Sequence, residues 1–68
     1  MPERLANRLK ERRTELGLTQ AELAEKVGVT RKTVNTVENG VFTPSATLAI
    51  KLARALELSV EQLFWIES

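Results

Sequence analysis

The sequence contains no cysteine, histidine or tyrosine, and all nine of its acidic residues are glutamate, so it has no aspartate either. Disulfides, Cys/His zinc sites, thiol or Ser-His-Asp catalysis and an Asp-rich calcium loop all require residues that are absent. A pair of glutamates could act as general acid and base, but a helical chain of 68 residues leaves little room for a pocket that would desolvate them. We therefore expect a protein that is not an enzyme and uses no metal ion or cofactor.

Long apolar runs are also missing, and none approaches the roughly 20 residues needed to cross a bilayer. The N-terminal residues are charged from Glu3 onward, unlike a secretory signal peptide. With 68 residues, of which 43% are apolar and 28% charged, the composition is typical of one globular domain spanning residues 1–68. We expect a cytoplasmic protein that has no membrane partner.

The formal net charge of +1 hides an uneven distribution. Residues 1–34 carry eight basic and five acidic side chains, whereas residues 35–68 carry two basic and four acidic ones. The two halves therefore have net charges of +3 and −2. This asymmetry suits a polyanion at one end of the molecule, although charged helix faces are often simply solvated.

Three glycines and a proline divide the chain into helical stretches. Gly17, Gly28 and Gly40 each follow such a stretch, where a residue free to adopt positive φ ends a helix at little cost. Pro44 prevents continuation after the third glycine. Residues that cap helix N-termini lie between these stops and beyond them: Thr19 with Glu22, Thr30, Ser45, and Ser59 with Gln62.

This punctuation predicts an all-α fold of five helices, spanning about residues 3–16, 20–27, 31–39, 46–56 and 60–65. No strand is expected. Apolar positions at helical spacing predict the side chains that turn inward from these helices. They are Leu5, Leu9, Leu16, Leu23, Ala24, Val27, Val34, Val37, Leu48, Ile50, Leu52, Ala53, Leu56, Leu58, Val60, Leu63 and Phe64.

Residues 19–40 contain two short helices joined only by Gly28, Val29 and Thr30. With so short a connection the helices must cross at a steep angle, and the small side chain of Ala24 permits their close approach. On the second of these helices, side chains that all donate hydrogen bonds fall within an arc of about 140°. They are Arg31, Lys32, Asn35, Thr36 and Asn39. A helix about 14 Å long with such a face fits a DNA major groove about 12 Å wide, although it could also be an ordinary solvated face.

The segment LGLTQAELAEKVGVTRKTVNTVENG, followed by PSATLAIKLARALELSVEQLF, resembles the Cro/CI-type (XRE-family) helix-turn-helix domain of bacterial, archaeal and phage regulators. The resemblance covers residues 5–64 and includes the L-T-Q-x-x-L-A opening, the turn glycine, the E-N-G exit and the P-S that follows. It implies a five-helix, lambda-repressor-like bundle. In such a bundle, helix 20–27 lies over the DNA backbone and helix 31–39, the recognition helix, enters the major groove.

The resemblance also implies roles for individual residues. It assigns contacts with bases to Arg31, Lys32, Asn35 and Thr36. Arg31 or Lys32 would suit guanine O6 and N7, and Asn35 would suit adenine N6 and N7. It assigns contacts with phosphates, which set the register without reading sequence, to Thr19, Gln20, Thr33 and Asn39. Asn39 could instead act only as a turn residue at the helix C-terminus.

Two neighbouring arginines raise different expectations. In the family pattern Arg13 pairs with Glu38 of the E-N-G exit, which would hold the recognition helix at its angle and keep Glu38 from repelling phosphate. Arg12 lies where relatives commonly have an apolar residue. Its stem could cover the core while its guanidinium reaches water, or it could add a contact to the DNA backbone.

A single recognition helix reads only a few base pairs, and each correct contact is worth about 1 to 3 kcal/mol, too little to select one site in a genome. We therefore expect a homodimer on a near-palindromic operator. Four apolar side chains have no evident role within the chain: Phe42, Val60, Trp65 and Ile66. We assign them to the dimer interface, although Trp65 could simply cover its own core.

The predicted function is that of a sequence-specific regulator of transcription that binds double-stranded DNA, most simply a repressor. An antitoxin or a restriction-modification controller that regulates its own operon would share this chemistry, and an antitoxin would also have a toxin partner. A helical protein-interaction module that keeps the scaffold without binding DNA is the alternative from a different class.

Overall fold

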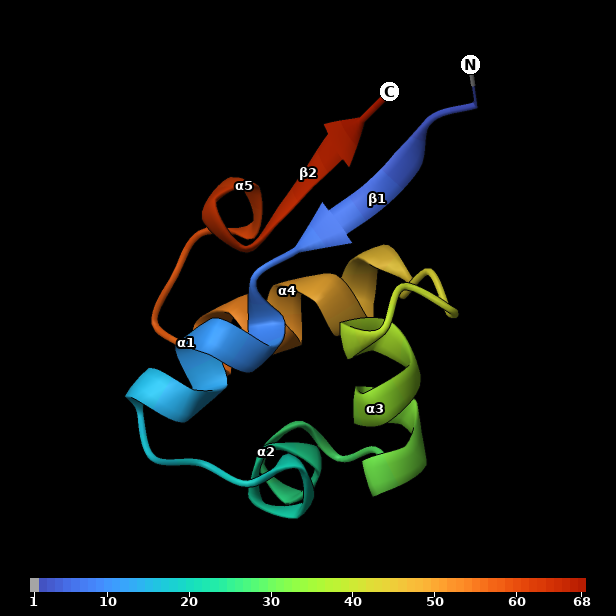
Figure 1. Cartoon of the computed structure of the whole chain (residues 1–68). Coiled ribbons are helices and arrows are strands. Elements are labelled where there is room, and N and C mark those ends of the chain that lie inside the picture. The colour runs from blue at the N-terminus through green and yellow to red at the C-terminus, as the bar shows by residue number, and fades with distance from the viewer. Residues whose placement is uncertain (1) are drawn as a thin grey trace.

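The computed structural model describes residues 2–68, which form five helices and one pair of short strands (Figure 1). In chain order the elements are β1 (Arg4–Asn7), α1 (Leu9–Glu15), α2 (Gln20–Val27), α3 (Arg31–Glu38), α4 (Ala46–Ala55), α5 (Val60–Leu63) and β2 (Phe64–Glu67). The helices pack around one core, and the strand pair projects from one side of the bundle (Figure 1).

The helices begin where the capping residues predict. Thr19 and Ser59 each form a complete capping box, with Glu22 and Gln62 respectively, which satisfies two backbone N–H groups at each of these helix starts. Thr30 and Ser45 cap α3 and α4 by accepting a hydrogen bond from the backbone N–H three residues later. These local hydrogen bonds explain why the starts of four helices follow from sequence.

The first and last elements differ from the sequence prediction. Residues 4–7 are a strand rather than helix, and the fifth helix ends at Leu63, two residues early. β1 pairs antiparallel with β2, with Asn7 opposite Phe64 and Arg4 opposite Glu67. The paired residues of the two strands are about 60 residues apart in sequence, so no local sequence pattern predicts that they pair. Leu5 therefore packs against the core from β1, not from a helix.

The Asn7 side chain lies where strand β1 ends and helix α1 begins. The Asn7 side-chain Oδ1 accepts a hydrogen bond from the backbone N–H of Leu9 at 2.9 Å, which satisfies a donor in the first turn of α1. The Arg8 N–H then donates to the carbonyl of Leu63 at 3.1 Å. Helix α1 consequently starts at Leu9 instead of residue 3.

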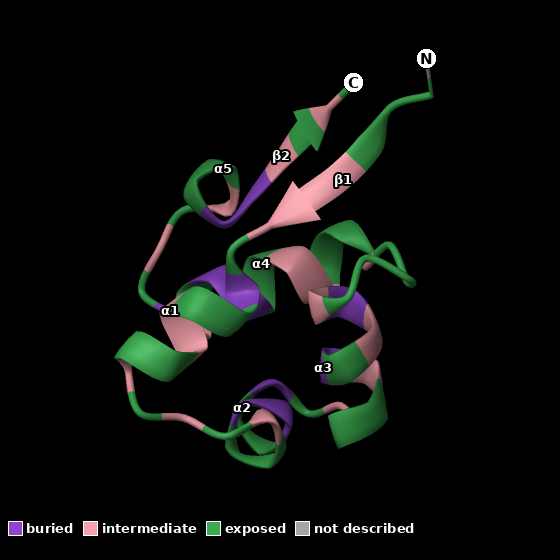
Figure 2. Ribbon diagram, in the orientation of Figure 1, coloured by how far each residue is buried: buried purple, intermediate pink, exposed green. Residues whose placement is uncertain are grey.

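The core consists of side chains from every helix together with Phe64 of β2, and Figure 2 shows these buried segments facing one another across the bundle. Its members are Leu9, Leu23, Ala24, Val27, Val34, Val37, Leu52, Ala53, Leu56, Leu63 and Phe64. Ile50 is an exception to the predicted core, because 44% of it is exposed on α4. The helix pattern overestimated how much of α4 is covered.

Within residues 2–68, no helix is both long enough and apolar enough to cross a membrane.

Candidate nucleic-acid interface

The helix-turn-helix is made by α2, a three-residue turn and α3. Gly28 ends α2 with a left-handed φ of 77°, and the N–H groups of Gly28 and Val29 both donate to the Ala24 carbonyl, at 2.9 and 3.0 Å. Thr30 then caps α3 through the N–H of Thr33. The turn therefore ends one helix and starts the next, with the N–H groups of Gly28 and Val29 both bonded.

Helix α3 has one buried and one open face. Val34 and Val37 are about 1% exposed and anchor the helix to the core. The opposite face contains side chains that donate hydrogen bonds and no acidic residue. Arg31, Lys32, Asn35 and Asn39 are exposed on it and Thr36 is half-buried at its edge. The burial pattern therefore matches the arc predicted from the sequence.

The polar side chains on this face differ in whether their hydrogen-bond donors are already bonded within the protein. The Thr36 hydroxyl donates to the Thr33 carbonyl at 2.9 Å, so its hydrogen is used within the helix. The Asn39 amide donates to the Asn35 side-chain oxygen at 3.3 Å. Among residues 2–68, neither Arg31 nor Lys32 forms an ion pair, so both cations face solvent. In this conformation the Thr36 hydroxyl hydrogen is bonded within the helix, whereas the two cations are unbonded within the described part of the chain.

The start of α2 has unbonded backbone N–H donors next to its N-cap residue, Thr19. The N–H groups of Gln20 and Ala21 lie in the first helical turn, where no intrahelical acceptor is available. The Gln20 side chain does not project freely, because its amide nitrogen donates to Glu38 Oε1 at 3.1 Å. That bond uses one of two amide hydrogens, so the other can still meet a phosphate oxygen.

The ion pair between Arg13 and Glu38 is present, as expected. Arg13 Nε lies 2.6 Å from Glu38 Oε2, and the two side chains are only 12% and 3% exposed. A further guanidinium nitrogen of Arg13 donates to the Leu18 carbonyl at 2.8 Å, at the end of the loop before α2. Together with the bond from Gln20, these contacts join α1, α2 and the last turn of α3.

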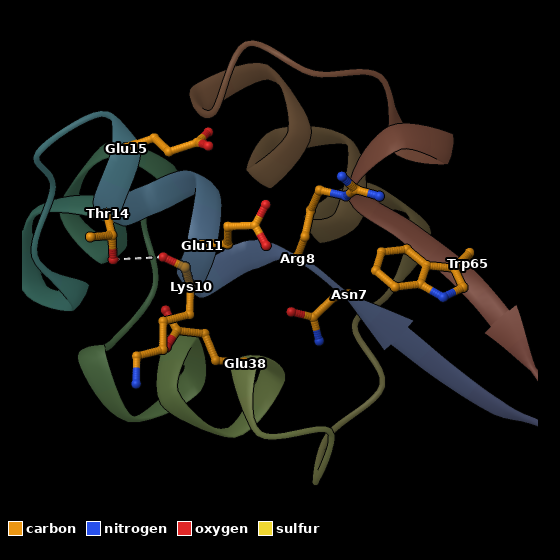
Figure 3. A pocket seen from close by; sticks show the side chains of 8 residues that line it. All are labelled: Asn7, Arg8, Lys10, Glu11, Thr14, Glu15, Glu38 and Trp65. Atoms are coloured by element: carbon orange, nitrogen blue, oxygen red, sulfur yellow. Dashed lines mark hydrogen bonds between the residues drawn. The ribbon is translucent and has the colours of Figure 1, made fainter.

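The charge of Glu38 is directed away from the open face of α3, and Figure 3 shows its side chain extending toward α1. It borders a hollow between α1, α3 and β2. The hollow is lined by Asn7, Arg8, Lys10, Glu11, Thr14, Glu15, Glu38 and Trp65. Three of these side chains are glutamates, so the hollow does not suit a phosphate group.

Arg12 makes contacts within the protein that neither expectation included. Its Nε donates to the carbonyl of Leu56 at 2.8 Å, at the C-terminal end of α4, and it also pairs with Glu15. A cation at that position is favourable because the helix dipole places partial negative charge there. Arg12 is therefore a structural link between α1 and α4.

Only two of the four side chains assigned to a dimer interface are open. Phe42 is 47% exposed and Ile66 59% exposed. Val60 packs against the core, which confirms the inward position that its helical spacing predicts and corrects the expectation that it has no role within the chain. Trp65 is partly covered, since the Arg8 guanidinium lies 5.1 Å from its ring centre and its indole N–H donates to Glu67.

One residue that positions the site was not among those expected from the sequence. The Asn7 amide nitrogen donates to the carbonyl of Val37 at 3.0 Å, and this bond ties the end of β1 to the last turn of α3. An asparagine two residues before a helical pattern is itself an N-terminal signal. The expected helix over residues 3–16 concealed it.

Comparison with known proteins agrees with this architecture. A helix-turn-helix family model matches residues 9–63. The uncharacterised HTH-type transcriptional regulator YgzD of Bacillus subtilis is 43% identical over 63 residues, which cover 93% of this chain and 96% of YgzD. The antitoxin HipB of Escherichia coli is 41% identical over 59 residues, which cover 87% of this chain and 63% of HipB.

Solved structures share the fold as well. The restriction-modification controller C.AhdI of Aeromonas hydrophila has a TM-score of 0.78 and 42% identity, over 84% of this chain and 83% of C.AhdI. SinR of Bacillus subtilis, solved in complex with DNA, has a TM-score of 0.74 and 34% identity, over 79% of this chain and 87% of that one. This chain spans only 53% of the matching chain in the SinR–SinI complex.

Fold, site and relatives thus define one class, and the chain belongs to the Cro/CI-type helix-turn-helix family of transcriptional regulators. The relatives and structural neighbours are regulators rather than enzymes, in agreement with the expectation from composition.

Proposed function

We propose that this protein binds double-stranded DNA at a specific operator and represses transcription by occupying it. The observation that supports this most directly is the open face of α3, which carries Arg31, Lys32, Asn35 and Asn39 with no acidic side chain. Such a face can enter a major groove, where arginine and lysine suit guanine and asparagine suits adenine. We assign base contacts to Arg31, Lys32 and Asn35.

Phosphate contacts on either side of the recognition helix would set its register. We assign them to Thr19 and Gln20 at the start of α2, to Thr33 of α3 and to Asn39 at the C-cap of α3. The start of α2 combines the unbonded backbone N–H groups of Gln20 and Ala21 with the positive end of a helix dipole, which together suit an anion. These contacts are indifferent to sequence and would add affinity at every site.

The protein acts as a homodimer in this proposal, because one α3 reads too few base pairs to select an operator. Ile66 is the most exposed of the interface residues proposed from sequence, and its neighbour Trp65 lies on the same strand. A two-fold axis near β2 would place the same patch of each copy against the other. The protein would meet its operator in the cytoplasm.

Selection of bound sites from a random DNA pool, followed by a gel shift on the selected sequence, tests the proposal. We expect a near-palindromic site bound about 10³ to 10⁷ times more tightly than random DNA. Equal affinity for all sequences, or no binding at low salt, would show that the helical scaffold serves another purpose.

Autoregulation together with a partner protein is the second candidate, and the similarity to HipB and C.AhdI favours it. The DNA immediately upstream of the protein's own gene is the discriminating probe. Tight binding there, strengthened by the product of the neighbouring gene, would support an antitoxin. Binding there without such an effect would support a controller.

A further inference from the structure

A small apolar cleft lies between the recognition helix and the loop that follows it. It is lined by Lys32, Thr33 and Thr36 of α3 and by Val41 and Phe42 of the loop. Val41 is 78% exposed, so this loop presents apolar surface beside the basic face of the helix. None of the lining side chains is acidic.

The loop is held against the helix by backbone hydrogen bonds. The N–H groups of Val41 and Phe42 both donate to the carbonyl of Thr36, at 2.9 and 3.2 Å. Gly40 makes the turn with a φ of 72°, and its N–H donates to the Val37 carbonyl at 3.1 Å. The cleft is therefore a built feature of the end of α3 rather than an incidental gap.

The hydroxyl groups beside the cleft are occupied by bonds within the protein. The Thr36 hydroxyl donates to the Thr33 carbonyl, and the Thr33 hydroxyl is hydrogen bonded to that of Thr30 at 3.1 Å. The lining is otherwise apolar and consists of the two threonine methyl groups, the stem of Lys32 and the side chains of the loop. This lining suits a small apolar group carried by an anionic molecule.

We propose that this cleft receives the C5-methyl group of a thymine in the major groove, so that Thr36 and Phe42 select thymine by apolar contact. The inference rests on the proposed function, because three of the five lining residues lie on α3 and the cleft continues its DNA-facing side. The thymine methyl is the one apolar group at a base edge in that groove, and threonine methyl and phenylalanine are side chains that contact it. Thr36 therefore reads a base without donating a hydrogen bond.

Replacing each thymine of the selected operator by deoxyuridine, one position at a time, removes only the methyl group. We expect one position in each half-site at which binding weakens about fourfold, the effect of leaving one methyl group unburied. At that position Phe42→Ala should bring the ratio of thymine to uracil affinity close to one. Ile50→Ala is the control variant, since Ile50 is an exposed apolar residue on α4, outside the cleft, and should keep the wild-type ratio.

The uracil scan of the wild-type protein is informative even if the Phe42 variant fails to fold. Specific binding that is insensitive to uracil at every position would overturn the thymine assignment and leave the proposed function intact. A Phe42 variant that becomes monomeric but keeps its thymine preference would show that the cleft receives a second copy of the chain instead. The absence of any preferred DNA sequence would overturn the proposed function itself.

Discussion

At the scale of single residues, the Arg13–Glu38 pair is the ion pair that we expect to affect the stability of the fold most. Both side chains are nearly covered, so removing either charge leaves the other desolvated and unpaired. The Gln20 amide donates to the same carboxylate, which places Glu38 at the meeting point of three helices. A carboxylate held in this way contributes to the position of α3 while its charge stays neutralised near the DNA-facing surface.

We predict strong coupling between Arg13 and Glu38. In a double-mutant cycle with Arg13→Met and Glu38→Gln, the coupling free energy of unfolding should be about 1 to 3 kcal/mol, measured by denaturant titration. The Arg4–Glu67 pair is a control of similar distance, 2.8 Å, but its side chains are 78% and 42% exposed. Its coupling should stay below about 1 kcal/mol, because solvent screens exposed pairs. Equal coupling in the two cycles would mean that burial of Glu38 has no energetic effect.

Base and phosphate contacts should respond differently to alanine substitution. Arg31→Ala should cost about 1 to 3 kcal/mol at the preferred operator and relax discrimination at one base pair per half-site. Asn39→Ala should weaken binding to specific and random DNA alike, because a phosphate contact carries no sequence information. Affinities measured for a panel of single-base operator variants separate these outcomes. Unchanged specificity in Arg31→Ala would remove that residue from the reading surface.

At the scale of secondary-structure elements, the capping box of α2 makes the start of the motif sensitive to acid. The hydrogen bond from the Thr19 N–H, followed by that from its hydroxyl, lowers the pKa of Glu22 below its usual 4.5. Because the folded state lowers this pKa, the ionised carboxylate stabilises the fold above the unfolded-state value. That stabilisation is lost as pH falls through the lower folded-state value.

The corresponding box of α5 provides the comparison, since Gln62 takes the place of the glutamate and does not titrate. The difference in unfolding free energy between wild type and Glu22→Gln should shrink as pH is lowered below the usual pKa of 4.5. The effect of Gln62→Ala should stay nearly constant over the same range. Denaturant titrations from pH 7 to pH 3 measure both, and a constant difference for Glu22→Gln would contradict the ionised capping box.

At the scale of the whole molecule, size and charge determine how two copies can meet DNA. The radius of gyration is 11.1 Å and the longest extent is 35 Å. Two such molecules side by side can place their recognition helices about 34 Å apart, one turn of DNA. The half-site centres of the operator should then be about 10 base pairs apart. The acidic residues near the C-terminus, Glu57, Glu61 and Glu67, would lie toward the partner and away from the phosphates.

We predict that Trp65→Ala with Ile66→Ser shifts the protein toward monomer and abolishes tight operator binding without unfolding it. Ile66→Ser alone is the cleaner test, since Trp65 also contacts Arg8 and its loss disturbs the monomer. Ile50→Ser serves as the control, because it removes an exposed isoleucine from α4. Sedimentation measures the assembly and circular dichroism the fold. Dimers that persist in Ile66→Ser would place the interface elsewhere.

The sequence by itself determined the features that depend on neighbouring residues. Four helix starts follow from capping side chains whose partners are three residues away, and the helix ends after α2 and α3 follow from glycines with positive φ. The open face of α3 follows from helical geometry alone. The Arg13–Glu38 pair, 25 residues apart, came from the family resemblance rather than from any local rule.

Only the tertiary structure decided the contacts between distant segments. Arg12 meets the end of α4 across 44 residues of sequence, and Asn7 meets α3 across 30. Likewise, β1 exists only because β2 lies beside it. These contacts depend on how packed helices position remote backbone groups. Every residue has a backbone carbonyl, so the sequence does not indicate which carbonyl accepts a hydrogen bond from a distant side chain. The exposure of Ile50 was also decided by the tertiary structure. Helical spacing indicates on which face of α4 a side chain lies, but not whether another element covers that face.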